Sequence, residues 1–124
     1  MTPEVILLCL ALNIYFEARG EPIEGQYAVA EVALRRAALS SKPVCVEVFS
    51  DSQFSWTLQA DTAKVRDKRM WATALTVARS VLAEPTNFSH GATHFHSIAV
   101  KPRWTRSLCL AARIGRHLFY RECR

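Results

Sequence analysis

The chain has 124 residues, of which 50% are hydrophobic and 22% are charged. This length fits one domain, and this composition excludes a disordered tail and an integral membrane protein. Sixteen Lys and Arg residues against eleven Asp and Glu residues give a formal net charge of +5, and a positive surface attracts polyanions such as nucleic acid or an anionic cell surface. The net charge alone does not distinguish these partners, and an ordinary solvated surface would account for the positive charge equally well.

The first predicted element is a buried helix at the N-terminus. Thr2, Pro3 and Glu4 form a good helix start, because a capping hydroxyl, a proline and an acid all suit the first turn. Residues 5–12 are apolar but too few to span a membrane, which takes about 20 apolar residues. They also lack the positive charge that opens a signal peptide. We therefore expect a core helix that ends near residues 18–20.

The rest of the chain changes from helical to strand-like patterns. Apolar spacing predicts helices over residues 25–39, 44–49 and 62–83. Residues 93–100 are typical of a strand, and residues 108–114 and 117–121 flank Gly115 as the two arms of a hairpin would. The predicted fold class is therefore α+β and mainly α-helical. We expect a single domain over residues 1–124, with a small sheet or hairpin in its C-terminal third.

The four cysteines are Cys9, Cys45, Cys109 and Cys123. They contain no CxxC pair, which argues against a zinc ribbon or a thioredoxin-like site, and they allow three different two-disulfide pairings. The low cysteine density and the lack of a secretion signal favour free thiols.

Three carboxylates, Glu17, Glu21 and Glu24, lie within eight positions of one another. Glu17 falls at the C-terminal end of the apolar helix beside two aromatic residues. Because the helix dipole and an apolar wall both disfavour a carboxylate there, its pKa should be raised, as a general acid at a glycosidic oxygen requires. Glu21 and Glu24 occupy a turn and a helix start, which is ordinary capping chemistry. We expect Arg19 to pair with one of them and to hold the turn after Glu17.

Residues 13–36, which contain the run Tyr-Phe-Glu-Ala-Arg-Gly-Glu-Pro-Ile-Glu-Gly-Gln, resemble the cell-wall hydrolase family typified by the spore-cortex-lytic enzyme of germinating bacilli. Residues 53–56 (Gln-Phe-Ser-Trp), 91–96 (Gly-Ala-Thr-His-Phe-His) and 114–120 (Ile-Gly-Arg-His-Leu-Phe-Tyr) look like later blocks of that family, and they occur in family order. The resemblance implies a lysozyme-like fold and cleavage of the β-1,4 bond between N-acetylmuramic acid and N-acetylglucosamine. It also places the family's catalytic glutamate on Glu17.

Sugars bind proteins through hydrogen bonds to amides and through stacking on aromatic faces. The candidates of this kind come from the motif blocks, although at least one of the aromatic residues in the 53–56 block is expected to be core instead. The predicted substrate-binding residues are Gln53, Phe54, Trp56, His94, His96 and Tyr120.

Three histidines, His90, His94 and His96, resemble a metal cluster. However, no acidic third ligand lies near them in the sequence, and the helical zinc-protease motif is absent. We therefore expect neither a metal nor another cofactor, and the resemblance implies that His94 lines the groove or braces the fold.

The reaction type depends on whether a second carboxylate assists Glu17. Asp51, Asp61 and Asp67 are not convincingly placed for this role. A single glutamate favours a lytic transglycosylase, in which the 6-hydroxyl of the sugar closes onto C1 and leaves a 1,6-anhydro end. A hydrolytic muramidase acting on the same bond is the alternative, and it usually needs two carboxylates.

A rival hypothesis of another class is a basic nucleic-acid-binding module. It is suggested by the basic residues between positions 64 and 69, but acidic residues at positions 61 and 67 interrupt them, which weakens it. We therefore expect peptidoglycan glycan strands as the partner, together with the anionic bacterial envelope, and not nucleic acid.

A monomeric, basic chain without a signal peptide suits a phage endolysin that serves host cell lysis. We expect such a protein to be made in the host cytoplasm and to act in the periplasm or cell wall once the membrane is breached.

Overall fold

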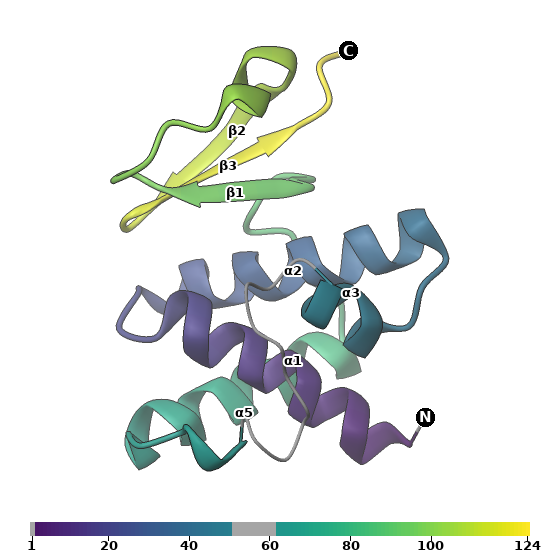
Figure 1. Ribbon diagram of the computed structural model, residues 1–124, viewed down its shortest axis with the longest axis vertical. Coiled ribbons are helices and arrows are strands. Elements are labelled where there is room, and N and C mark those ends of the chain that lie inside the picture. The colour runs from purple at the N-terminus through teal and green to yellow at the C-terminus, as the bar shows by residue number, and fades with distance from the viewer. Residues whose placement is uncertain (1, 51–61) are drawn as a thin grey trace.

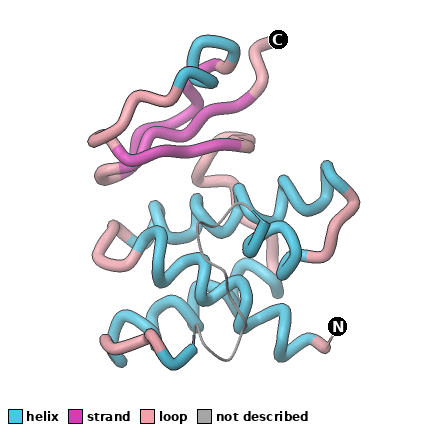
Figure 2. Tube along the Cα trace, in the orientation of Figure 1, coloured by secondary structure: helices cyan, strands magenta, loops and turns pink. Residues whose placement is uncertain are grey.

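The computed structural model describes residues 2–50 and 62–124. A group of helices carries a small antiparallel sheet, which stands against α2 with the C-terminus at its far end, while the N-terminus lies among the helices (Figure 1). The strands lie together at one end of the molecule (Figure 2) and come from the last third of the chain, so the predicted α+β, mainly α-helical class is confirmed. The elements in chain order are α1 (Pro3–Ala18), α2 (Ile23–Ser40), α3 (Val44–Ser50), α5 (Lys68–Ala83), β1 (His94–Ser97), the 3-10 helix η1 (Arg103–Ser107), β2 (Cys109–Ile114) and β3 (His117–Arg121).

Helix α1 runs through the helical part and packs against α2, α3 and α5. It begins where expected, because the hydroxyl of Thr2 accepts a hydrogen bond from the backbone N–H of Val5 at 3.2 Å and Pro3 follows in the first turn. Leu10, Ile14 and Tyr15 are fully buried in the same cluster as the small residues of α2 and α5. The last turn of α1, which carries Glu17, is therefore fixed by the core behind it.

Two predicted boundaries differ from the structure. The long helix expected over residues 62–83 is present as α5 only from Lys68, because the side chain of Asp67 accepts a hydrogen bond from the backbone N–H of Met70 and caps a new helix start. The strand expected over residues 93–100 ends at Ser97, whose carbonyl accepts a hydrogen bond from the backbone N–H of Val100 and so begins a turn.

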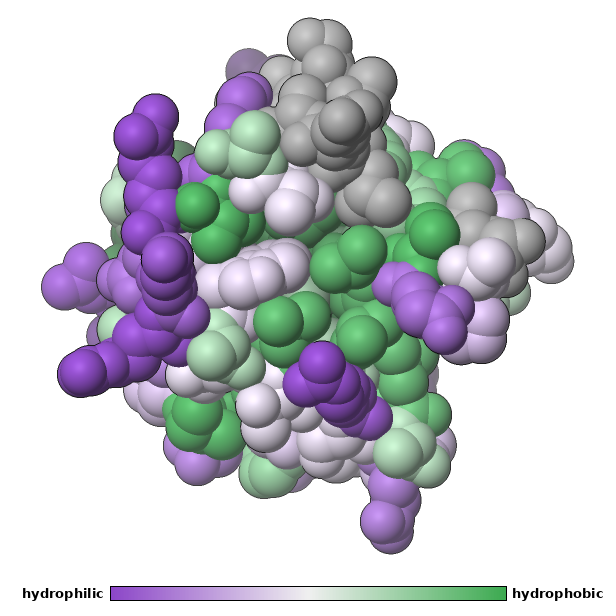
Figure 3. Space-filling view, turned by 90° about the horizontal axis from the view of Figure 1, so that it is seen from below, coloured by the Kyte–Doolittle hydropathy of each residue, from purple (hydrophilic) through white to green (hydrophobic). Residues whose placement is uncertain are grey.

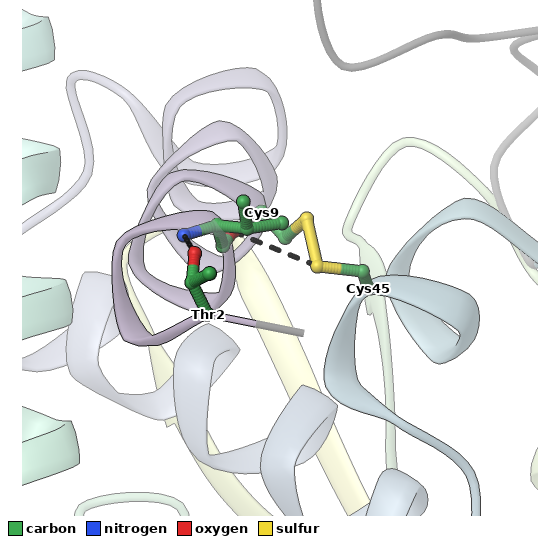
Figure 4. The surroundings of a disulfide bond; sticks show 4 residues. Thr2, Cys9 and Cys45 are labelled. Carbon is green, nitrogen blue, oxygen red and sulfur yellow. Dashed lines mark hydrogen bonds between the residues drawn. A yellow bond between two sulfur atoms is a disulfide. The ribbon is translucent and has the colours of Figure 1, made fainter.

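The expectation of free thiols is wrong. Cys9 and Cys45 form a disulfide that joins α1 to α3 (Figure 4), and Cys109 and Cys123 form a second one that joins β2 to the chain after β3. The Cα atoms of the pairs are 5.2 and 5.1 Å apart, well within disulfide reach. Cysteine density cannot reveal such pairs, because folding brings together residues that the sequence separates.

The segment before β1 is held by polar side chains of α2. Glu31 is only 4% exposed, and its carboxylate accepts hydrogen bonds from the hydroxyl of Thr86 and the backbone N–H groups of Phe88 and Ser89 at 2.6–2.9 Å. One turn later, Arg36 donates to the carbonyl of Thr93 at 3.3 Å. These bonds satisfy a buried carboxylate, and they set the position at which β1 begins.

The hairpin predicted around Gly115 is confirmed. Strand β3 lies between β1 and β2, and both pairings are antiparallel. The registers set His94 opposite Tyr120 and Ile114 opposite His117. The sheet therefore carries the 91–96 and 114–120 blocks side by side, although the sequence separates them.

The turn between β2 and β3 rests on Glu21, which lies in the turn between α1 and α2. The Glu21 carboxylate accepts a hydrogen bond from the backbone N–H of Arg116 at 2.8 Å and lies 3.6 Å from Nδ1 of His117. Gly115 has a positive φ of 56°, and a Cβ atom on it would lie 2.5 Å from a Glu21 oxygen. We call this arrangement of Glu21, Gly115, Arg116 and His117 the Glu21 contact. It secures the sheet to the helices.

Replacing Gly115 by Ala should destabilise the protein more than the same change at Gly20. Both glycines have positive φ, but a Cβ on Gly20 would meet nothing within 4 Å, whereas one on Gly115 would meet Glu21 and Pro22. Gly20→Ala should cost only the backbone penalty, about 1–2 kcal/mol, and Gly115→Ala about 3 kcal/mol or more because of the added overlap. Urea denaturation measures both. Equal losses would show that the hairpin turn has room to move.

Reducing both disulfides should lower the melting temperature substantially. They close loops of 36 and 14 residues, which in the chain-entropy model stabilise the fold by about 4 and about 3 kcal/mol. For a domain of this size the loss should be at least about 15 °C, measured by circular dichroism with and without a phosphine reductant. Thiol counting after alkylation is the control, and an unchanged melting curve of fully reduced protein would contradict the expectation.

Candidate active site

A cleft of about 780 Å³ opens between the helices and the sheet. Its volume is in the range of ordinary ligand sites. One wall comes from the second half of α1, the floor from α2, one end from α3, and the opposite wall from β1 and the residues that follow it. The main polar and aromatic groups that line it are Asn13, Phe16, Glu17, Arg36, Glu47, Phe49, His94, Phe95, His96, Trp104 and His117.

Glu17 lies in the last turn of α1 and faces this cleft. Its side chain keeps contact with solvent, yet the surrounding walls remove part of its hydrating water, and this desolvation raises the pKa of Glu17 above the usual 4.5. The direction matches the sequence-based expectation. A carboxyl group that holds its proton to higher pH and remains accessible can act as a general acid.

The wall opposite Glu17 is built from rings on the sheet and on η1. Trp104 contacts His94 and Tyr120, with ring centroids 5.0 and 5.3 Å apart, and His96 stacks on Tyr120 at 5.3 Å. Nδ1 of His96 lies 2.7 Å from the carbonyl of Ser97, which can only accept, so Nδ1 carries the proton. In the neutral ring Nε2 then accepts a hydrogen bond from the hydroxyl of Tyr120 at 3.1 Å. These bonds fix the orientation of the rings, and aromatic faces of this kind can stack on sugars.

Three of the predicted substrate-binding residues, His94, His96 and Tyr120, therefore lie together on this wall, although only the first two line the cleft directly. The other three, Gln53, Phe54 and Trp56, lie outside the described residues, as do Asp51 and Asp61. Asp67 is engaged as the cap of α5.

His117 joins the cleft to the Glu21 contact. It is buried and lines the cleft. Burial lowers the pKa of His117 below its usual 6.5, the Glu21 carboxylate works against this, and His96 adds to it. The ring is thus mostly neutral at neutral pH and adds no full positive charge to this side of the cleft.

Glu47 is a second carboxylate in the cleft, and it was not among the residues predicted from the sequence. Glu47 is 6% exposed, and its oxygens are bound by Nε of Arg36 at 3.4 Å and by the hydroxyl of Ser40 at 3.2 Å. The available signal was a single acid in the otherwise apolar run at residues 44–49. Trp104 was not among the predicted substrate-binding residues, because nothing in its local sequence distinguishes it from a core tryptophan.

Asn13, one helical turn before Glu17, was also missed. Its Nδ2 is buried and has no hydrogen-bond partner in the structure as described, and the residue lines the cleft. A buried amide donor without an acceptor is unfavourable. Asn13 therefore places a hydrogen-bond donor in the cleft one turn from Glu17.

The expected ion pair of Arg19 with Glu21 or Glu24 is wrong. Nη1 of Arg19 instead donates to the hydroxyl of Tyr15 at 2.7 Å, and its guanidinium lies over the Tyr15 ring at 4.8 Å. Arg19 and Tyr15 are four residues apart on α1, so they share a face of that helix, whereas Glu21 is engaged by the hairpin.

Neither a metal site nor a membrane span is found within residues 2–50 and 62–124. No group of three or more His, Cys, Asp and Glu side chains is arranged to hold a metal ion there. In the same residues, no helix combines the length and apolar character needed to cross a membrane.

Comparison with known proteins gives the family. The model of the cell wall hydrolase family matches residues 20–120. The chain belongs to this family. The match begins just after Glu17, so it covers the Glu21 contact and the ring wall but not Glu17 itself. A search of curated proteins found no match for this cell wall hydrolase.

Two solved structures resemble the cell wall hydrolase over nearly its whole length. The catalytic domain of the Bacillus cereus SleB protein is 23% identical, with a TM-score of 0.68 over 98% of this chain and 93% of that one. The catalytic domain of the germination-specific lytic transglycosylase SleB from Bacillus anthracis is 25% identical, with a TM-score of 0.68 over 97% of each chain. The lysozyme-like fold that the resemblance implied is confirmed by these matches.

The raised pKa of Glu17 can be measured directly in this cell wall hydrolase. A carbon-detected NMR titration of the Glu17 carboxyl should give a midpoint above 4.5. Because the folded-state pKa is raised, ionisation of Glu17 opposes folding, so stability contributed by the protonated form is lost as pH rises through that pKa. Glu17→Gln should therefore be at least as stable as the unmodified protein at pH 7. A midpoint at or below 4.5 would contradict the expectation.

Proposed function

We propose that this protein is a lytic transglycosylase that cleaves the β-1,4 bond between N-acetylmuramic acid and N-acetylglucosamine in peptidoglycan, with Glu17 as acid and then base. The observation that carries the proposal is the position of Glu17, an accessible carboxyl with a raised pKa, opposite a wall of fixed rings in one cleft. Membership of the cell wall hydrolase family supports the substrate class, and the description of the Bacillus anthracis relative as a lytic transglycosylase supports the reaction type.

In the first step, the carboxyl proton of Glu17 passes to the glycosidic oxygen, and the bond from that oxygen to C1 of the muramyl residue breaks. In the second step, the 6-hydroxyl of the same muramyl residue bonds to C1 and gives its proton to the Glu17 carboxylate. The acid form of Glu17 is thereby regenerated, and no water is consumed. A raised pKa suits both steps, because the group must give up a proton and then recover it.

Glu47 is the residue that supports the alternative reaction, that of a hydrolytic muramidase. It provides a second carboxylate in the cleft, which a hydrolase could use to activate water. However, Arg36 and Ser40 already bind the two oxygens of Glu47. These bonds favour a fixed, structural role for Glu47 in the floor of the cleft over a role as a base. Glu47 is therefore the first residue to replace if the products prove to be hydrolytic.

We also propose that the protein acts as a monomer in the bacterial cell envelope, as a phage endolysin would after the membrane is breached. Two disulfides support this location, because such bonds persist in oxidising compartments and not in the cytosol. The net charge of +5 supports attraction to an anionic wall.

Digestion of purified peptidoglycan tests the function. The unmodified protein should release fragments that end in 1,6-anhydromuramic acid, each lighter by one water than a hydrolysed end, as measured by mass spectrometry. Glu17→Gln should lower the rate by roughly 10²–10⁴-fold or more, because an amide cannot donate the required proton.

The matched control is Glu24→Gln, which makes the same chemical change at an exposed position at the start of α2 and should leave the rate unchanged. Retained activity in folded Glu17→Gln protein would rule out the assigned role of Glu17. Fragments with reducing muramic ends would show that the enzyme is a muramidase and not a transglycosylase, and Glu47→Gln would then be the decisive variant.

A further inference from the structure

Polar groups are unevenly spread over the helical end of the molecule. Seen from that end, hydrophilic side chains project along one edge of the face, and hydrophobic side chains cover much of its centre (Figure 3). A second pocket of about 640 Å³ lies at the C-terminal half of α1 and the approach to α5. It combines four cationic side chains with one acid and one aromatic ring, and its lining residues are Phe16, Arg19, Lys64, Arg66, Asp67 and Lys68.

The pocket is held in shape by one phenol. The hydroxyl of Tyr15 accepts hydrogen bonds from Arg19 at 2.7 Å and from the backbone N–H groups of Arg66 and Asp67 at 3.2 and 3.0 Å. Burial by itself would raise the pKa of Tyr15, but these three donors outweigh it and lower the pKa. A single buried group thus fixes a guanidinium on α1 and the chain at residues 66–67 relative to each other.

Asp67, the acid among the lining residues that the structure describes, does not cancel the charge of the pocket. Asp67 is the N-cap of α5, and its Oδ1 accepts the hydrogen bond of Met70 at 3.0 Å. Arg19 makes its side-chain hydrogen bond within the described residues to a neutral phenol and not to a carboxylate. Among the described lining residues, Asp67 alone faces the cations Arg19, Arg66 and Lys68, so this part of the pocket carries a net positive charge.

Phe16 connects this pocket to the catalytic cleft, since it lines both and precedes Glu17 in the chain. A glycan strand in the cleft is made of neutral sugars apart from its substituents, so it offers no charge for the basic pocket. The lactyl group of each muramic acid, however, carries a peptide stem with free carboxylates. Arginine and lysine side chains bind carboxylates through charge-assisted hydrogen bonds.

We propose that this pocket binds a carboxylate of the peptide stem of a muramic acid whose sugar lies in the cleft. The proposal rests on the proposed function, because it takes the cleft as the site of the glycan strand. It makes the enzyme selective for peptide-bearing strands over strands from which the stems have been removed. A nucleic acid is a weaker occupant, because Phe16 is the only ring among the described lining residues, and single strands need a series of stacking platforms.

The test compares two charge-matched double variants in the inactive Glu17→Gln background. Arg66→Gln with Lys68→Gln removes two pocket charges, and Arg69→Gln with Arg79→Gln removes two exposed charges of α5 that are not in the pocket. Dissociation constants are measured by calorimetry for uncross-linked peptide-bearing glycan strands and for the same strands after an amidase has removed the stems.

The pocket variant should bind peptide-bearing strands roughly threefold to tenfold more weakly, as two partly exposed ion pairs imply, and stripped strands as before. The control variant should bind both as before. An unchanged affinity for peptide-bearing strands, or an equal loss on both substrates, would overturn the proposal. So would a loss on a single-stranded DNA oligonucleotide as large as that on peptide-bearing strands, because it would indicate a general polyanion surface.

Cleavage by the active protein is followed in parallel on both substrates. If neither substrate is cut but the binding differences appear, the role of the basic pocket is supported and the proposed reaction is contradicted. If both substrates are cut but the binding differences are absent, the proposed reaction is supported and the role of the basic pocket is contradicted.

Discussion

The carboxylate of Glu21 ties the β2–β3 turn to the helices, next to the side of the cleft that His117 lines. It binds the backbone of the β2–β3 turn at Arg116 and lies beside His117, and the lack of a side chain at Gly115 allows this close approach. A second glycine, Gly25 on α2, packs against a residue of β2 in the same region. The two glutamates of the Glu-Ala-Arg-Gly-Glu run thus have separate tasks: Glu17 faces the cleft, and Glu21 holds the β2–β3 turn.

Neighbouring residues near the end of helix α1 face two different sites, the cleft and the basic pocket. Glu17 and Phe16 face the catalytic cleft, while Tyr15 and Arg19 face the chain that leads into α5. The buried core behind the helix prevents it from rotating to favour one side. The cleft and the basic pocket are therefore fixed relative to each other, as the proposed binding of a peptide-bearing glycan strand requires.

Local patterns predicted the parts of this structure that depend on neighbouring residues. The capped start of α1, its end after Ala18 and the hairpin around Gly115 follow from turn residues and apolar spacing. The pKa direction of Glu17 could be argued in the same way, from an apolar helix end. The disulfides, the ion pair of Glu47 and the ring wall at Trp104 could not, because each joins groups that only the folded chain brings together.

The Glu21 contact also bears on the order of folding. Its hydrogen bond joins residues that are 95 positions apart, whereas the helices form from contacts within a few residues. Contacts of long sequence separation carry a large loop-closure cost and form late. During synthesis the helical part can collapse while the hairpin is still missing, and at that stage Glu17 has no opposing wall. The wall that faces Glu17 is therefore complete only when β2 and β3 have settled on the helices.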